Sequence, residues 1–185
     1  MPYEEKNVAG KRVKETDYYK RMLLRSEKFR KEYGEKKRCL TPEEMPWEDS
    51  PQGRIKHLVN EEMDTVECCL DMYMQEIPPG SRSGKHRHMA EELFYVLEGK
   101  GYDLHWDASF TLDDKYHWHW EEEPKKFEWE EGDFVYIPPY TTHQHFNADP
   151  DKPARFITAT NRLVREMGFD WWEQIENAPE YKEGK

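Results

Sequence analysis

The sequence predicts an all-β chain built around one antiparallel sandwich or barrel. Between residues 54 and 161, short runs rich in aromatic and β-branched residues alternate with turns that contain glycine, proline or aspartate. No helical segment separates these runs, and no internal repeat indicates a second barrel. With 185 residues, 36% apolar and 36% charged, the chain suits one domain with a large polar surface and terminal extensions.

The expected strands follow one another along this central region with short connections. The second strand ends at Pro78-Pro79-Gly80, and a later hairpin closes at Glu98-Gly99-Lys100-Gly101. The expected strands cover residues 54–60, 65–77, 85–89, 93–97, 102–106, 116–120, 126–129, 134–137, 144–147 and 154–160.

The two ends of the chain have a different character from the centre. Apolar residues between positions 11 and 33 recur at three- and four-residue spacing among many charges, which predicts a surface helix that stops near Gly34. Residues 41–53 hold three prolines and read as an extended linker. A short helix is expected at residues 171–176. The predicted organisation is therefore an arm over 1–53, a barrel over 54–161 and a helical tail over 162–185.

The composition excludes some classes of partner. A formal net charge of −11 argues against a general binder of nucleic acids or anionic membranes, since both require a basic surface. No apolar run approaches 18 residues, and we expect neither a membrane span nor a secretory signal. Three cysteines, Cys39, Cys68 and Cys69, show no pairing pattern, so a reduced, cytoplasmic protein is expected.

Two short motifs carry the chemistry. Residues i and i+2 of a strand share a face, so His86 and His88 present both imidazoles to one side. A turn at Ala90-Glu91 lets the next strand return with Glu92 at its start. His143 begins a strand of its own about fifty residues later. Three imidazoles and one carboxylate suit a first-row divalent metal and leave coordination positions for other ligands.

The two motifs together resemble those of the cupin family, G-x5-H-x-H-x3,4-E-x6-G and G-x5-P-x-G-x2-H-x3-N. Their only departure is Tyr140, which stands where the family usually has glycine, so Tyr140 is expected either to adopt an unusual backbone conformation or to lean over the mouth of the pocket. The resemblance covers residues 54–160 and implies a single jelly-roll barrel with a metal inside. It implies that His86, His88, Glu92 and His143 are the metal ligands, and that Asn147 is structural. The first motif is filled by Gly80, His86, His88, Glu92 and Gly99, and the second by Gly132, Pro138, His143 and Asn147.

The resemblance implies a metal-dependent enzyme, with a dioxygenase acting on a small oxygenated aromatic or enediol as the leading hypothesis. Fe(II) is the expected metal, with Mn, Ni or Zn as alternatives, and Glu92 and His145 are the candidate catalytic groups. The carboxylate makes the site similar to those of quercetin and acireductone dioxygenases or oxalate decarboxylase rather than gentisate dioxygenases. A lyase, decarboxylase or isomerase and a non-catalytic ligand-binding cupin remain as alternatives. A mostly apolar pocket is expected from nearby aromatic residues: Phe94, Tyr102, Trp106, Phe134, Tyr136 and Phe146.

Several other residues have simpler explanations. His117 and His119 alternate with tryptophan, but no third ligand stands nearby, so an aromatic hairpin inserted between the motifs is expected. Arg87 should point away from the metal by strand alternation, whereas His105 is a weak candidate for the barrel interior. The partners expected are a small-molecule substrate and a second copy of the chain, since the apolar stripe of the first helix suits a homodimer.

Overall fold

The computed structural model describes residues 16–67, 69–169 and 171–183, and these fall into two units, 1–36 and 37–185. The first unit contains helix α1 (Tyr18–Tyr33), none of whose residues is buried. It confirms a helix within residues 11–33, although positions 11–15 lie outside the described residues. Among the residues described, no helix combines the length and the apolar character that crossing a membrane requires. The cytoplasmic location stays a prediction.

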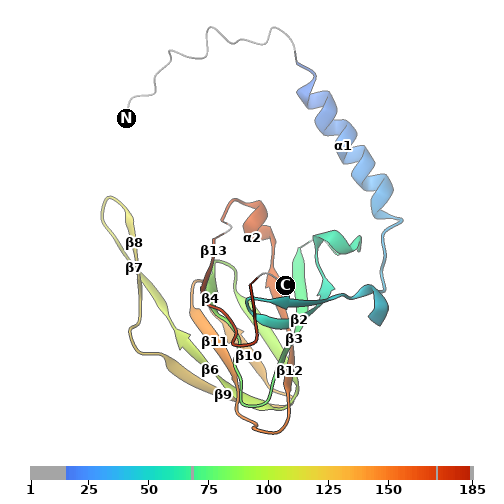
Figure 1. The fold of residues 1–185 in the computed structure, drawn as a ribbon. Coiled ribbons are helices and arrows are strands. Elements are labelled where there is room, and N and C mark those ends of the chain that lie inside the picture. Colours follow the sequence, from blue (N-terminus) through green and yellow to red (C-terminus); the bar gives the residue numbers. More distant parts are fainter. Residues whose placement is uncertain (1–15, 68, 170, 184–185) are drawn as a thin grey trace. The chain divides into compact units, whose positions relative to one another are not determined.

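The second unit is a β-barrel made of two sheets (Figure 1). The six-stranded sheet has the order β1-β2-β3-β12-β5-β10, and the five-stranded sheet has the order β13-β4-β11-β6-β9. Neighbouring strands are antiparallel throughout. The strands are β1 (Trp47–Ser50), β2 (Gly53–Val59), β3 (Leu70–Ile77), β4 (Lys85–His88), β5 (Glu92–Glu98), β6 (Lys100–Trp106), β9 (Lys125–Glu130), β10 (Phe134–Ile137), β11 (Thr142–Asn147), β12 (Ala154–Asn161) and β13 (Trp172–Glu176). This arrangement confirms the predicted jelly-roll.

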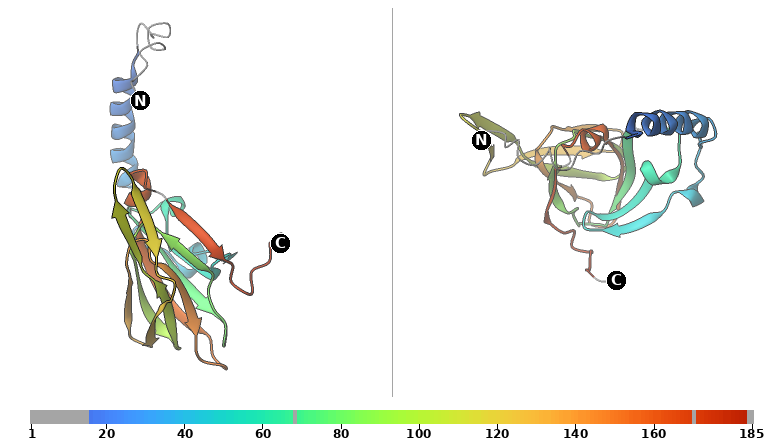
Figure 2. Two further views of the ribbon diagram at one scale, coloured as in Figure 1. Left: turned by 90° about the vertical axis from the view of Figure 1, so that its left-hand side faces the viewer. Right: turned by 90° about the horizontal axis from the view of Figure 1, so that it is seen from above.

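A separate hairpin of β7 (Ala108–Leu112) and β8 (Tyr116–Trp120) projects from the barrel, as the two further views in Figure 2 also show. Its cross-strand register places Phe110 opposite Trp118 and Thr111 opposite His117. One face is therefore aromatic and the other polar. The predicted aromatic insert between the motifs is confirmed as a hairpin.

The barrel core lies between the two sheets, where alternate residues of each strand face inward. Strand β5 shows this clearly, since Phe94 and Val96 are fully buried whereas Tyr95 is exposed. The core consists of Ile77, Phe94, Val96, Trp129, Ile137, Ala154 and Phe156. Aromatic rings dominate it, with the Phe94 and Phe156 centroids 4.5 Å apart. Buried polar side chains lie directly against this core, as the 5.2 Å between the Phe94 and His145 ring centroids shows.

Two predicted elements differ from the structure. Residues 171–176 do not form a helix, because Trp172–Glu176 pairs with the edge strand β4, where each backbone group gains a ladder hydrogen bond. The short helix of the tail is α2 (Leu163–Glu166) instead. The expected linker over 41–53 contains η3 (Pro42–Glu44) and strand β1, which pairs with β2. A further short helix, η4 (Glu61–Met63), joins β2 to β3.

Candidate metal centre

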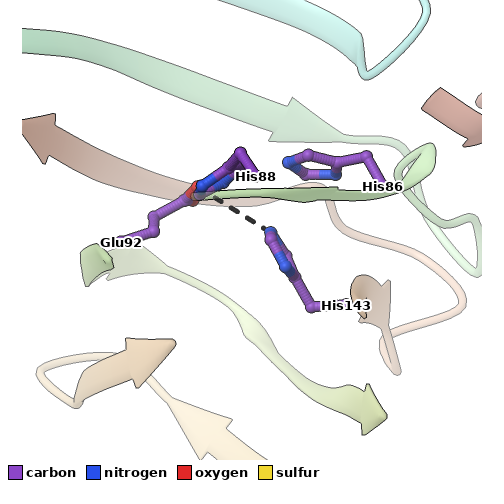
Figure 3. A group of neighbouring side chains, drawn as sticks. All are labelled: His86, His88, Glu92 and His143. Carbon is purple, nitrogen blue, oxygen red and sulfur yellow. Dashed lines mark hydrogen bonds and ion pairs between the residues drawn. The ribbon is translucent and has the colours of Figure 1, made fainter. Parts of the chain in front are cut away.

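Strands from both sheets bring the four predicted ligands together inside the barrel (Figure 3). His86 and His88 point inward from β4, Glu92 opens β5, and His143 lies directly opposite His86 in the β11–β4 pairing. All four side chains are buried, and one ligand atom of each lies within 4.8 Å of the others. The spacing of the two motifs thus predicts one continuous cluster, and the structure contains it.

Glu92 is the anionic centre of the cluster. Its Oε2 lies 3.0 Å from His88 Nε2 and 3.8 Å from His143 Nε2, while its Oε1 accepts a 2.7 Å hydrogen bond from the Thr158 hydroxyl. Burial disfavours the charged carboxylate, but its contact with His88 and the nearby imidazoles outweigh this penalty and lower the pKa of Glu92 from 4.5 to about 2. Glu92 is therefore ionised at neutral pH.

Backbone carbonyls fix the orientation of two imidazoles. His88 Nδ1 donates to Ala90 O at 2.7 Å, and His143 Nδ1 donates to Thr141 O at 2.9 Å. Both Nε2 atoms then carry lone pairs that face the cluster, which is the tautomer a metal-ligating histidine requires. Burial also lowers the pKa of His143 to about 3 and that of His86 well below its usual range, so both rings are neutral.

These atoms fit a divalent metal. Within the described residues, neither ring nitrogen of His86 has a hydrogen-bond partner, and His143 Nε2 has none either. The lone pair of His88 Nε2 faces the Glu92 carboxylate, and two acceptors 3.0 Å apart need a shared cation or proton between them. Leaving such groups buried without partners costs about 1–3 kcal/mol each. Three imidazoles and one carboxylate suggest a first-row divalent metal.

A second buried network lies behind the cluster. Asp103 on β6 is fully buried and accepts hydrogen bonds from His145 Nδ1 at 2.9 Å, His105 Nε2 at 3.3 Å and Trp129 Nε1 at 2.8 Å. Burial opposes a charge on His145, but Asp103 outweighs it and raises the pKa of the imidazole. His145 Nε2 has no partner among the described residues, and the His143 and His145 ring centroids lie 5.5 Å apart. His145 is thus a buried imidazole, oriented by Asp103, beside the metal ligands.

The two sequence motifs do not include three residues that contact the candidate ligands or their neighbours: Asp103, Thr158 and Trp172. Asp103 shares a face of β6 with His105, so strand alternation was the one available signal. Thr158 approaches Glu92 only through the β12–β5 pairing, which joins distant parts of the chain. Trp172 stacks on His88 and His86 with ring centroids 4.5 and 5.2 Å apart, because β13 pairs with β4.

The prediction of a mostly apolar pocket is wrong for five of its six residues. Phe94 is buried, but Phe134 and Tyr136 point outward from β10 and are exposed. Tyr102 and Phe146 stack on each other from neighbouring outward positions of β6 and β11, and Trp106 lies under Lys85. Strand alternation assigns the inward positions of β6 to Asp103 and His105. Of the six aromatic residues, only Phe94 therefore faces the interior, where its ring lies beside the buried imidazole of His145.

Tyr140 and Asn147, both in the second motif, adopt the conformation and the role that the motif predicts. Tyr140 has φ of 63°, the left-handed conformation that glycine usually supplies at this position. Its ring packs between Trp118 and Trp171 at 4.4 and 4.9 Å, and its N–H donates to His88 O. Asn147 is structural, since its amide donates to three backbone carbonyls, those of Ile77, Pro78 and Lys152.

The remaining candidate residues lie away from the cluster. Arg87 points outward, where it pairs with Glu173 and stacks over Trp120. His117 and His119 are exposed on the polar face of the hairpin. His117 groups with Asp113 and Asp114, but all three residues are exposed. The hairpin histidines are therefore not part of the buried site.

A jelly-roll barrel with this buried group of three histidines and a glutamate defines a cupin. A family model described as "auxin binding protein" matches residues 49–177, so the chain belongs to the auxin-binding protein family. It is 38% identical to an uncharacterised protein of Methanocaldococcus jannaschii, over 37% of this chain and 42% of that protein. It is 26% identical to auxin-binding protein T85 of Nicotiana tabacum, over 61% of this chain and 57% of that protein. The matches thus span about half the length of these relatives.

Solved structures agree with the fold. A serine-to-alanine mutant of Bacillus subtilis oxalate decarboxylase aligns with a TM-score of 0.51 and 17% identity, covering 73% of this chain and 30% of that chain. An arginine-to-alanine mutant of the same enzyme gives a TM-score of 0.50 and 19% identity, covering 65% of this chain and 29% of that chain. At this identity the similarity establishes the fold alone.

Proposed function

We propose that this chain is a metal-dependent enzyme that binds one divalent transition metal through His86, His88, Glu92 and His143. The buried imidazole nitrogens without hydrogen-bond partners carry this proposal. A metal bound there would supply a Lewis acid with open positions for the oxygen atoms of a small-molecule substrate. Fe(II) is the first candidate, with Mn, Ni and Zn as alternatives, because the donor set suits all four.

The chain's own residues provide a route for protons. Glu92 is ionised and held by Thr158, so it stays in place as an anionic ligand. His145, held by Asp103, presents an unpartnered Nε2 within the same barrel interior, where it could take a proton from a bound substrate or return one. Trp172 covers the imidazoles of His86 and His88 and limits the access of water to them.

Two reaction classes follow from this arrangement. A lyase, decarboxylase or isomerase uses the Lewis acid and the proton carrier without O2, and the His145–Asp103 pair favours it. A dioxygenase acting on a small oxygenated aromatic or enediol uses the same ligands with Fe(II), but most of the aromatic residues expected to line its pocket face away from the interior. A non-catalytic ligand-binding cupin is the third candidate, favoured by the tobacco relatives that are named auxin-binding proteins.

Comparing metal-loaded protein with the Asp103→Asn and His143→Ala variants tests the proposal. We expect the wild type to convert a substrate only when metal is bound, and His143→Ala to lose both metal and turnover. Asp103→Asn should keep the metal but lose about 10²–10⁴-fold in turnover, because His145 loses its orienting carboxylate. Oxygen consumption during turnover assigns the dioxygenase, and its absence assigns the lyase group. Metal-dependent ligand binding without turnover would contradict the enzyme proposal and support the binding protein.

The homodimer is part of this proposal. The outward face of β5 and β10 exposes four large apolar side chains, Tyr95, Leu97, Phe134 and Tyr136. Register pairs Tyr95 with Phe134, so these side chains form one patch of the kind that sheet-on-sheet contacts bury. Sedimentation of the wild type and of a Tyr95→Lys/Phe134→Lys variant tests it, with dimer expected for the first and monomer for the second.

A further inference from the structure

A large cavity adjoins the metal cluster within the barrel unit. Its volume is about 1070 Å³, enough for a small organic molecule. Trp172, on the five-stranded sheet, lines the cavity and stacks on the imidazoles of His86 and His88. Tyr73, on the six-stranded sheet, lines it as well. A ligand in this cavity would therefore lie next to the metal-binding residues and in reach of Tyr73.

Strand alternation places Tyr73 on the inner face of β3. It shares that face with Gln75 and Ile77, both of which are buried. In the β12–β3 pairing Tyr73 lies directly opposite Thr158. Thr158 is fully buried, and its hydroxyl donates to Glu92 Oε1 at 2.7 Å. Only one side chain therefore stands between this part of the cavity wall and the Glu92 ligand.

The hydroxyl of Tyr73 stays protonated at neutral pH. It forms a hydrogen bond with the Thr158 hydroxyl and lies in the field of the Glu92 carboxylate. Burial raises the pKa of the Tyr73 hydroxyl well above its usual value of 10, and the negative charge of Glu92 raises it further. The side chain is thus a neutral phenol, with one hydrogen to donate and an oxygen that can accept.

The charge of Glu92 fixes the direction of this chain of hydrogen bonds. An ionised carboxylate only accepts, so the single hydrogen of the Thr158 hydroxyl goes to Glu92 Oε1. Thr158 then offers only its oxygen to Tyr73, and the Tyr73 hydroxyl donates to it. The phenol hydrogen is thereby used, while the phenol oxygen keeps its capacity to accept at the cavity wall. A ligand satisfies this oxygen only by donating a hydrogen bond to it.

We propose that the Tyr73 hydroxyl binds the substrate of the metal site and selects molecules that carry a hydroxyl group close to the oxygen atom that the metal binds. This inference rests on the proposed function and deepens it, because it names the substrate class. A hydroxy acid, a hydroxy ketone or an enediol offers such a hydroxyl group as a donor. A plain carboxylate has no hydrogen to donate at neutral pH and would leave the Tyr73 oxygen without a partner.

Two probes that differ in one hydrogen-bond donor test this inference: mandelate and its O-methyl ether. Both carry the same ring, the same carboxylate and a second oxygen atom, but only mandelate can donate a hydrogen bond from that oxygen. Calorimetric titration of the manganese-loaded full chain at pH 7 should show mandelate binding at least about fivefold more tightly. Equal binding of the two probes, tighter binding of the ether, or no binding of mandelate would overturn the inference.

A variant that lacks only the phenol oxygen assigns the preference to Tyr73. Tyr73→Phe keeps the ring and should reduce the preference for mandelate to within about twofold. Tyr102→Phe is the matched control, because Tyr102 stacks on Phe146 and does not line this cavity. It should keep the full preference. A preference that survives in Tyr73→Phe, or that falls equally in both variants, would contradict the role of the Tyr73 hydroxyl.

Elemental analysis of the same samples separates this inference from the proposed function. Tyr73→Phe should hold as much manganese as the wild type, because Thr158 still donates to Glu92. Loss of metal from Tyr73→Phe would show that Tyr73 supports the ligand instead of binding substrate, and would overturn the inference. A wild type that holds no metal, yet prefers mandelate through Tyr73, would contradict the proposed function alone. Full metal content with no effect of Tyr73→Phe on the preference would contradict the inference alone.

Discussion

Strand β4 of the barrel and strand β8 of the projecting hairpin each carry two histidines separated by one residue, yet only the pair on β4 belongs to the buried cluster of candidate ligands. His86 and His88 are buried between two sheets, where β5 and β11 supply Glu92 and His143. His117 and His119 lie on a two-stranded hairpin, and both are exposed. The histidine spacing is identical. The two pairs differ in their surroundings. The barrel interior excludes water from His86 and His88, and neighbouring strands supply further ligand side chains there.

The largest contrast we expect between the two regions concerns stability. Phe94→Ala in the barrel core should lower the free energy of unfolding by about 3–5 kcal/mol, because the ring is fully buried against Phe156 and Trp129. Phe110→Ala on the hairpin, where the ring is half exposed, should cost less than about 1 kcal/mol. Urea unfolding of both variants measures this, and equal losses would show that the hairpin shares the barrel core.

The second contrast concerns metal affinity, which should depend on a hydroxyl that holds Glu92 in the barrel but not on a hydroxyl of the hairpin. Thr158→Val keeps the shape of the side chain but removes the hydroxyl that donates to Glu92 Oε1, so metal affinity should fall about 10–100-fold. Thr111→Val, which removes a hydroxyl near His119, should leave affinity unchanged. Competition with a chromophoric chelator measures both. An unchanged affinity in Thr158→Val would mean that Glu92 is not a ligand.

The stability of the metal-free protein should depend on pH because of the buried groups in the barrel. The pKa of buried His143 is about 3 against 6.5 in the unfolded chain, and that of Glu92 is about 2 against 4.5. In both intervals the unfolded chain binds more protons, so stability is complete above pH 6.5 and is lost progressively toward pH 3 and below. Each proton contributes up to about 1.4 kcal/mol per pH unit.

Urea unfolding at pH 7, 5 and 4 checks this expectation. His143→Phe should flatten the profile between pH 6.5 and 3, because it removes the imidazole whose pKa burial lowers. A wild-type profile that is independent of pH would contradict the burial of a neutral His143.

The smallest effect concerns Tyr140, whose ring contacts β8 of the hairpin through Trp118. Tyr140→Ala loses the ring contacts and keeps the left-handed backbone, whereas Tyr140→Gly loses the same contacts and relieves the strain. The glycine variant should therefore be more stable than the alanine variant by about 1 kcal/mol. Thermal unfolding compares them, and an alanine variant of equal or greater stability would show that the backbone is not strained.

The sequence predicts which side chains of a strand face inward, because alternation along the strand alone determines this. His86 and His88 share a face, Phe94 and Val96 turn inward, and Tyr95 turns outward, all as their positions require. The four ligands were recognisable because two motifs carry them at fixed spacings. The left-handed Tyr140 was predictable for the same reason, since it replaces a glycine.

The parts that the sequence does not predict depend on pairings between distant segments. Trp172 covers the cluster only because residues 172–176 add a strand to β4, and their local sequence suits a helix equally well. Asp103 matters because β6 pairs with β11 and places it opposite His145. The aromatic residues predicted to line the pocket lie near the motifs in sequence, but their positions on alternate sides of the strands decide which face they occupy.

Metal content tests the central claim most directly. Protein loaded with manganese, dialysed and analysed by elemental mass spectrometry should hold about one ion per chain in the wild type and in a His117→Ala/His119→Ala variant. A His86→Ala/His143→Ala variant should hold almost none, because half of the ligands are gone. Equal metal in both double variants, or metal lost only from the hairpin variant, would contradict the assignment of the site to the barrel interior.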